Sequence, residues 1–213
     1  MKLLSVNVGM PREVQINGRP VMTAIDKCPV SGPVRLGRLT LAGDGQADLT
    51  VHGGEFQAAY SYPFEHYDHW QKAMGVDRYP HGMFGENFTV TGLLEEEVCV
   101  GDILRIGKAA VQVTIPRYPC FKFGHKIGRP DILKAFLESG KSGFYHRVIE
   151  EGDVEAGDEI ELVHRDTHGI TVRRLLGLAK FGEGDHALIQ RALAIEWLPP
   201  VVRQPLEARL LAK

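Results

Sequence analysis

The sequence predicts a β-rich α+β fold, in which a mixed β-barrel with isolated helices is followed by a small unit of three C-terminal helices. The first observation is that Val111, Val113 and Ile115 alternate with polar residues, which is the period of a half-buried strand. The second is Asn17-Gly18, the commonest short signal for a β-hairpin turn. The third is the appearance of short helical patterns after residue 166. Strands interrupted by isolated helices favour a barrel over a βαβ series.

The elements of the barrel are expected in a fixed order along the chain. Residues 14–21 form the hairpin, and a helix follows Pro63, because the fixed φ of proline suits a first helical turn. Strands are expected over residues 103–107 and 110–115, and a second helix over residues 130–140. The buried stripes of the two helices are Phe64, Tyr67, Trp70 and Met74 in the first and Ile132, Leu133, Phe136 and Leu137 in the second.

The C-terminal unit is expected to be helical throughout. Its three short helices are predicted over residues 171–181, 185–195 and 200–211. A boundary near residue 166 divides the chain into a barrel domain of residues 1–165 and a three-helix extension of residues 166–213. Three short helices also invite comparison with a helix-turn-helix DNA reader. From Arg165 onward, however, the chain carries eight basic and five acidic residues, and this weak excess favours a small helical packing domain.

Composition excludes several classes of protein. The 213 residues include 25 Lys and Arg against 27 Asp and Glu, a net charge of −2, so no nucleic-acid partner is predicted. No run approaches the roughly 20 apolar residues of a membrane span, and the N-terminus reaches Asn7 too early for a secretory signal. The three cysteines contain no CxxC pair and fit a reducing compartment, so the cytoplasm is predicted. Cys99 is expected in the core and Cys28 in a loop.

Cys120 lies in the segment with the most reactive side chains, residues 115–126. It follows a predicted strand and lies between Arg117 and Lys122. Nearby cations favour the thiolate, which is the form that attacks electrophiles or binds metals. Prolines on its N-terminal side stiffen the approach to the cysteine. The alternative is a buried cysteine at a strand end, with the cations facing solvent.

A glycine-rich segment over residues 43–54 is a second candidate. Four glycines let the backbone approach a ligand and expose N–H groups to an anion, although the spacing fits neither a Walker A loop nor a Rossmann fingerprint. His52, which precedes Gly53 and Gly54, is interpreted as a positioned polar residue at a cleft.

Two further segments carry polar groups with open roles. Asn87 can hydrogen-bond an anion or the edge of a heterocycle, whereas its neighbour Glu86 can cap nearby backbone. Lys141, Tyr145 and Arg147 alternate along one stretch, where they form either a wall of the same cleft or an ordinary solvated strand face.

Taken together, these segments resemble the MOSC domain, the family named for the C-terminal domain of molybdenum-cofactor sulfurases. The matching residues are Gly43-Asp44-Gly45-Gln46-Ala47-Asp48, His52-Gly53-Gly54, Ala59-Tyr60-Ser61-Tyr62, Phe84-Gly85-Glu86-Asn87-Phe88-Thr89, Gly101-Asp102 and Pro116-Arg117-Tyr118-Pro119-Cys120-Phe121-Lys122. Their order and spacing match over residues 40–165. The helical tail resembles the extension of the bacterial branch, which includes 6-N-hydroxylaminopurine reductases, although it is shorter than expected and Cys28 has no family counterpart.

The resemblance implies a β-barrel that holds a molybdenum cofactor of the pterin-dithiolene type. Cys120 is then the molybdenum ligand, a soft sulfur suited to this metal. Arg117 and Lys122 neutralise the anionic parts of the cofactor, while the backbone at His52, Gly53 and Gly54 and the side chain of Asn87 orient it. The catalytic residues implied are Cys120 and His52.

The implied reaction is the reduction of an N–OH group in small molecules such as hydroxylamino-purine base analogues. No flavin or nicotinamide motif is visible, so the two electrons come from a separate flavin or iron–sulfur reductase. His52, Tyr145 and a metal-bound water are all able to donate the proton to the leaving oxygen. A homodimer is compatible with the sequence, which does not determine the oligomeric state. The alternative functions are a carrier of sulfur, as a persulfide on Cys120, or of the cofactor, and a pure interaction protein.

Overall fold

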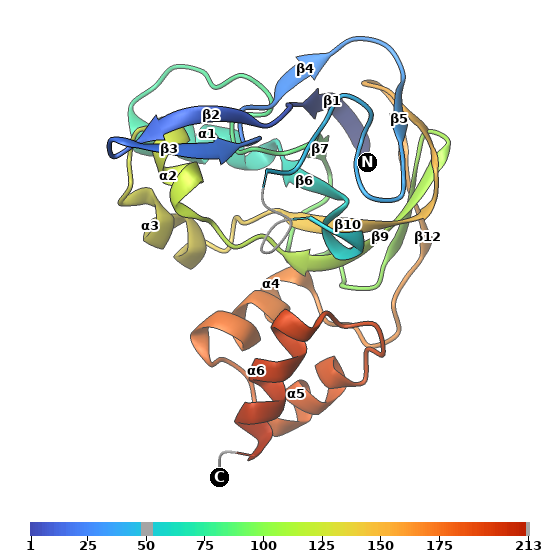
Figure 1. Cartoon of the computed structure of the whole chain (residues 1–213). Helices are drawn as coiled ribbons and strands as arrows, with labels where there is room; N and C mark the ends of the chain where they lie inside the picture. Colours follow the sequence, from blue (N-terminus) through green and yellow to red (C-terminus); the bar gives the residue numbers. More distant parts are fainter. Residues whose placement is uncertain (48–52, 212–213) are drawn as a thin grey trace.

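The computed structural model describes residues 1–47 and 53–211, and an eight-stranded sheet forms its body (Figure 1). The hydrogen-bonded order of the strands is β12 (Ile160–His164), β8 (Ile103–Ile106), β9 (Ala109–Pro116), β10 (Phe144–Glu150), β6 (Ala59–Pro63), β7 (Phe88–Thr91), β1 (Lys2–Val8) and β4 (Cys28–Val30). Neighbouring strands are antiparallel except β6 and β7, which are parallel. The predicted strands over residues 103–107 and 110–115 are confirmed as β8, which ends at Ile106, and β9. The fold is therefore a mixed α+β fold with a large sheet.

The closed barrel expected from the sequence is not confirmed. At one end of the sheet, Leu3 N–H donates to the Asp158 carbonyl over 2.9 Å, and Ile160 N–H donates to the Met1 carbonyl over 2.9 Å. After a bulge between Leu3 and Ser5, however, β1 takes β4 as its outer neighbour, so β4 and β12 are the edges of the sheet. Near β12, β1 thus forms an isolated bridge between Lys2 and Glu159 rather than a continuous ladder, a long-range feature that alternation within single strands does not encode.

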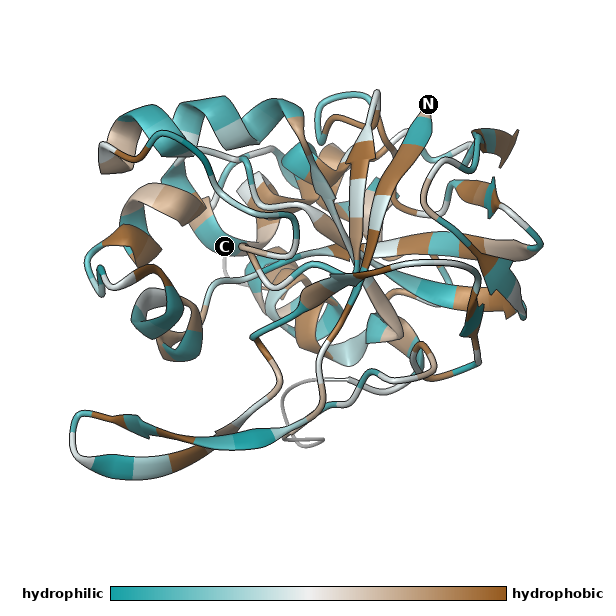
Figure 2. Ribbon diagram, turned by 90° about the horizontal axis from the view of Figure 1, so that it is seen from above, coloured by the Kyte–Doolittle hydropathy of each residue, from teal (hydrophilic) through white to brown (hydrophobic). Residues whose placement is uncertain are grey.

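A β-hairpin of strands β2 (Arg12–Ile16) and β3 (Arg19–Thr23) extends away from the sheet, as Figure 2 shows. Its turn places Asn17 at φ 51° and Gly18 at φ 73°, the left-handed values that a tight two-residue turn requires. The hairpin predicted over residues 14–21 is confirmed. A second small sheet pairs β5 (Val34–Leu36) with β11 (Gly152–Val154).

Helices enclose a cluster of aromatic side chains on one side of the sheet. The helices are α1 (Glu65–Met74), α2 (Phe121–Ile127) and α3 (Ile132–Glu138), and a 3₁₀ turn, η1 (Glu55–Gln57), precedes β6. Both predicted helices, α1 and α3, are present, and α1 ends at Gly75 with φ 66°. The aromatic cluster contains Tyr60, Tyr62, Tyr67, Trp70, Tyr79, Phe84, Phe123 and Phe136. Helix α2, which the sequence analysis did not predict, adds Phe123 to this cluster and begins directly after Cys120.

The C-terminal region contains α4 (Val172–Leu176), a π-helical turn η2 (Gly177–Phe181), α5 (His186–Leu193) and α6 (Pro200–Leu211). Thr171 and Asp185 cap the N-termini of α4 and α5 by accepting bonds from Arg174 N–H and Leu188 N–H. Seven of their buried residues belong to one hydrophobic cluster with the sheet: Val172, Leu175, Leu178, Ile189, Ala192, Val202 and Leu206. The three-helix extension is therefore not confirmed as a separate unit, and the boundary near residue 166 stays a prediction.

Within residues 1–47 and 53–211, no helix combines the length and the apolar character needed to cross a lipid bilayer.

Candidate functional site

A cleft opens where the loop after β9, the root of the β2–β3 hairpin and the glycine-rich loop come together. It holds about 710 Å³ of empty space, part of which is open to solvent. The predicted site residues that line it are Gly53, Asn87, Arg117, Cys120 and Lys122. Gly54 is not part of its wall, and His52 lies outside the residues that the structure describes. The structure therefore brings together side chains from distant parts of the sequence.

Cys120 is held at the end of a rigid strand. All eight residues of β9 are buried, and the chain leaves this strand through Arg117-Tyr118-Pro119. Cys120 then occupies the N-cap position of α2 with an extended backbone, and its carbonyl accepts a hydrogen bond from Phe123 N–H over 2.9 Å. Its side chain is half-buried at the cleft. Strand and helix thus fix the direction of the thiol.

Arg117 is a buried cation with no acidic partner in the described part of the chain. The guanidinium carbon lies 4.5 Å from the ring centroid of Phe123 and 5.4 Å from that of Tyr60, so aromatic faces support the charge. Its Nη1 atom is buried and has no hydrogen-bond partner among the described residues. Arginine stays protonated, and a buried charge without a partner is costly. An anionic ligand in the cleft would relieve that cost.

Lys122 adds a second cation on the first turn of α2. The residue is 9% exposed, lines the cleft and forms no ion pair with any described residue. Together with Arg117 it makes the surroundings of Cys120 positively charged. The structure places both cations in the same cleft wall as the cysteine, and the roles predicted for them stay predictions.

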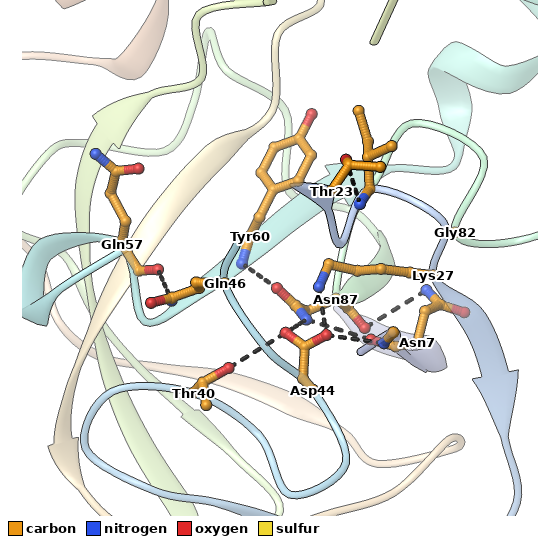
Figure 3. A network of polar contacts seen from close by, with 12 residues as sticks. Asn7, Thr23, Lys27, Thr40, Asp44, Gln46, Gln57, Tyr60, Gly82 and Asn87 are labelled. Atoms are coloured by element: carbon orange, nitrogen blue, oxygen red, sulfur yellow. Dashed lines mark hydrogen bonds and ion pairs between the residues drawn. The ribbon is translucent and has the colours of Figure 1, made fainter. Parts of the chain in front are cut away.

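The opposite wall of the cleft is a closed polar network around Asp44 (Figure 3). The Asp44 carboxylate forms an ion pair with Lys27 and accepts hydrogen bonds from Gly9 N–H over 2.8 Å, Thr40 Oγ1 over 3.2 Å and Asn87 Nδ2 over 2.9 Å. Burial lowers the pKa of Lys27, and the nearby Asp44 carboxylate opposes this shift. These residues satisfy one another, so this wall carries little free charge.

Asn87 is engaged within this network rather than free to bind a ligand. Its Nδ2 donates to Asp44 and to the Asn7 carbonyl, and its Oδ1 accepts from Tyr60 N–H over 3.1 Å (Figure 3). Both amide hydrogens are therefore used, and the residue positions the wall. Glu86 has the capping role anticipated as one alternative, because it accepts from Gly82 N–H over 2.8 Å and from Phe84 N–H over 3.0 Å.

Two consecutive glycines shape the backbone beside the cleft. Gly53 has φ 101° and Gly54 has φ 76°, conformations that favour glycine. A side chain at Gly53 would also collide with the Gln46 side chain. The Gly54 carbonyl accepts a hydrogen bond from Gln57 N–H, and Gly54 is the N-cap residue of η1.

Three tyrosines form the aromatic part of the wall: Tyr60, Tyr118 and Tyr145. The rings of Tyr60 and Tyr145 are 5.3 Å apart, and Lys180 from the C-terminal region lies 4.1 Å from the centroid of Tyr118. Of the three residues considered for a wall in the stretch 141–147, only Tyr145 lines the cleft. The side chain of Arg147 instead donates to Gln112 over 2.6 Å and stacks on Trp197.

Lys27 and the hairpin root, residues 23–25, also line the cleft, although they were not predicted to do so. Nothing in their local sequence signals it, because the hairpin root reaches the cleft only through the packing of the loops. Tyr60 and Tyr118 stood within matched motifs but had no assigned role.

The other cysteines lie apart from this arrangement. Cys99 is buried, as predicted, and Cys28 is exposed at the edge strand β4. Over residues 1–47 and 53–211, no group of three or more His, Cys, Asp or Glu side chains is arranged to bind a metal ion by itself. A metal at Cys120 would thus need further ligands from a cofactor.

Comparisons with known proteins agree on one family. The model of the MOSC domain matches residues 48–161. The uncharacterized protein YflK of Bacillus subtilis is 43% identical over 171 residues, which cover 80% of this chain and 77% of that protein. The crystal structure of YiiM from Geobacillus stearothermophilus has a TM-score of 0.81 and 35% identity, and the match covers 98% of both chains. A protein of Gibberella moniliformis named a reductase is 34% identical over 166 residues, which cover 76% of this chain and 29% of that protein.

Proposed function

The chain belongs to the MOSC domain family, and on this premise we propose that it is a molybdenum-cofactor-dependent reductase of N-hydroxylated compounds, hydroxylamino-purine base analogues among them. The similarity to a fungal protein named a reductase supports oxidoreductase chemistry. The family supports the binding of a molybdenum cofactor.

The observation that carries the proposal is the pairing of a half-buried cysteine with a buried guanidinium that lacks a partner. Arg117 Nη1 has no acceptor among the described residues, and Lys122 beside it forms no ion pair there. An anionic cofactor would neutralise both cations. Cys120 offers a soft sulfur ligand to the metal of such a cofactor. The donor set therefore fits the group that the family implies.

Each part of the cleft has a role in this proposal. When bound, the cofactor supplies the two-electron chemistry. Cys120 holds the metal, and Arg117 and Lys122 neutralise the anionic groups. The Asp44 network keeps the opposite wall rigid, and the tyrosine rings offer an apolar face to a planar substrate.

A separate electron donor of the flavin or iron–sulfur class is part of the proposal. The fungal reductase supports it, because the similar region accounts for only 29% of that longer protein. In this proposal the donor binds as a separate partner.

The first test is molybdenum analysis. The protein is produced in a host that makes the cofactor, and metal is measured in the wild type, in Cys120→Ala and in Cys28→Ala. We expect near-stoichiometric molybdenum in the wild type and in Cys28→Ala, because Cys28 is exposed outside the cleft. We expect loss of metal in Cys120→Ala.

Folded wild-type protein without molybdenum, in a host shown to supply the cofactor, would contradict the proposal. In that case mass spectrometry of Cys120 distinguishes the alternative: the mass of one additional sulfur on this residue would indicate a persulfide carrier.

A further inference from the structure

The three tyrosines of the cleft differ in what their hydroxyl groups can reach. The Tyr60 hydroxyl donates to the Ser142 carbonyl over 2.7 Å and is already used. The Tyr118 hydroxyl is buried and has no hydrogen-bond partner among the described residues. Tyr145 is half-buried and lines the cleft, and its hydroxyl faces the Arg117 guanidinium, with no hydrogen-bond acceptor for its proton among the described residues.

The neighbour of Tyr145 determines which way its hydroxyl proton can point. The Arg117 guanidinium lies close enough to oppose the rise that burial causes in the pKa of Tyr145. A guanidinium carries only donors, so it can interact with the phenol oxygen but cannot accept the phenol proton. The O–H of Tyr145 is therefore available to a molecule in the cleft.

Strand geometry holds Tyr145 in this position. It lies in β10 opposite Tyr60 of β6, and its neighbour His146 points into the core on the other side of the sheet. Pairing with β6 thus holds Tyr145 in the cleft wall that also contains Cys120, where a substrate would meet the metal ligand, while the register with β9 shifts between Phe144 and His146.

We propose that Tyr145 is a catalytic residue, which donates a hydrogen bond and then its proton to the oxygen that leaves the N–OH group. This inference rests on the proposed function. In the reaction the N–O bond breaks, two electrons arrive from the flavin or iron–sulfur partner, and two protons are consumed. One proton, from Tyr145, completes water on the oxygen. The other, from solvent, completes the amine, and a solvent proton restores the phenol.

The position of the hydroxyl can be tested without the cofactor. The metal-free protein is treated with N-acetylimidazole, which acetylates accessible phenols, and the modified tyrosines are identified by mass spectrometry. Tyr145 should be acetylated faster than Tyr60 and Tyr118. Faster modification of either of the other two would overturn the inference, because another hydroxyl would then face the cleft.

The catalytic role is tested in molybdenum-loaded protein with 6-N-hydroxylaminopurine as substrate and reduced methyl viologen as electron source. Tyr145→Phe should lower kcat by about 100-fold or more, the usual effect of losing a positioned acid, and change KM by less than about 10-fold. Tyr79→Phe is the control, because Tyr79 lies in the aromatic cluster outside the cleft. Its kcat should stay within about 2-fold of the wild type.

The outcomes separate this inference from the function on which it rests. A wild type that reduces the substrate, with Tyr145→Phe within 3-fold of its kcat at equal molybdenum content, leaves the function standing and overturns the role of Tyr145. Loss of kcat in His52→Gln together with full activity in Tyr145→Phe would assign the proton to His52 instead. A loaded wild type that reduces no N-hydroxyl compound removes the function and the inference with it.

Discussion

At the scale of single residues, one buried histidine makes the stability of this protein sensitive to acid. His146 is fully buried, its Nε2 lies 2.6 Å from Ser61 Oγ, and its Nδ1 has no partner in the described residues. Burial lowers its pKa to about 3, against about 6.5 in the unfolded chain. Between these two values the unfolded state binds the extra proton, so the free energy of unfolding falls as the pH drops from 6.5 towards 3.

We therefore expect protonation of His146 to lower the free energy of unfolding by about 4–5 kcal/mol between pH 7 and pH 3. Urea denaturation of the wild type and of His146→Gln at several pH values between 7 and 4 measures this. The wild type should lose stability more steeply than the variant, which lacks the titrating ring. Equal slopes would contradict the assignment.

Other single residues show what the sequence can and cannot indicate about a site. Cys120, Arg117 and Lys122 were found because their residue types cluster within six positions, and the fold keeps them together. Asn87 was expected to reach the ligand but its amide is used within the wall. Sequence proximity cannot reveal such competition, because the groups that occupy Asn87 come from positions about 80 and 43 residues away.

At the scale of elements, the pair of Asp44 and Lys27 joins the glycine-rich loop to the segment after the hairpin. The side chains are 3% and 9% exposed, so removing either leaves a buried charge behind. Asp44→Ala should cost about 3–5 kcal/mol. Adding Lys27→Met should restore part of this loss, because the double variant no longer buries an unpaired cation.

A double-mutant cycle from urea denaturation checks this coupling, with the two single variants as references. Simple addition of the two losses would show that the ion pair does not hold the loops together. The measurement concerns stability alone, so it is independent of any cofactor.

The prediction of elements succeeded where the signal is local. The hairpin at Asn17-Gly18, helix α1 with its Gly75 end and the alternating strand β9 all depend on turn chemistry or side-chain period. Helix α2 was missed, because its seven residues are too few for a periodic apolar stripe, include Gly124 and follow Pro119 directly after Cys120. The closed barrel was not confirmed, because closure depends on pairing between strands that are distant in the sequence.

At the scale of the whole molecule, the C-terminal helices and the sheet form one packed body. Val100 N–H donates to the Ile170 carbonyl and Val172 N–H donates to the Val98 carbonyl, each over 2.9 Å. Arg147 of β10 stacks on Trp197 at 5.0 Å. The change of composition near residue 166 predicted a domain boundary. Composition alone does not indicate whether the apolar faces of the C-terminal helices pack against the sheet. Helix α4 buries Val172 and Leu175 in the same cluster as the sheet.

A chain cut after residue 165 should therefore fail to fold into a rigid structure. It would expose the apolar face that α4 covers and leave the backbone groups of residues 98–100 without their partners. We expect such a fragment to keep far-ultraviolet circular dichroism, lose its near-ultraviolet signal and bind a hydrophobic dye, as molten states do. Residues 1–211 serve as the control and should unfold cooperatively. If the fragment of residues 1–165 also unfolds cooperatively with a native near-ultraviolet spectrum, the boundary separates two independent domains and the shared cluster is an interface between them.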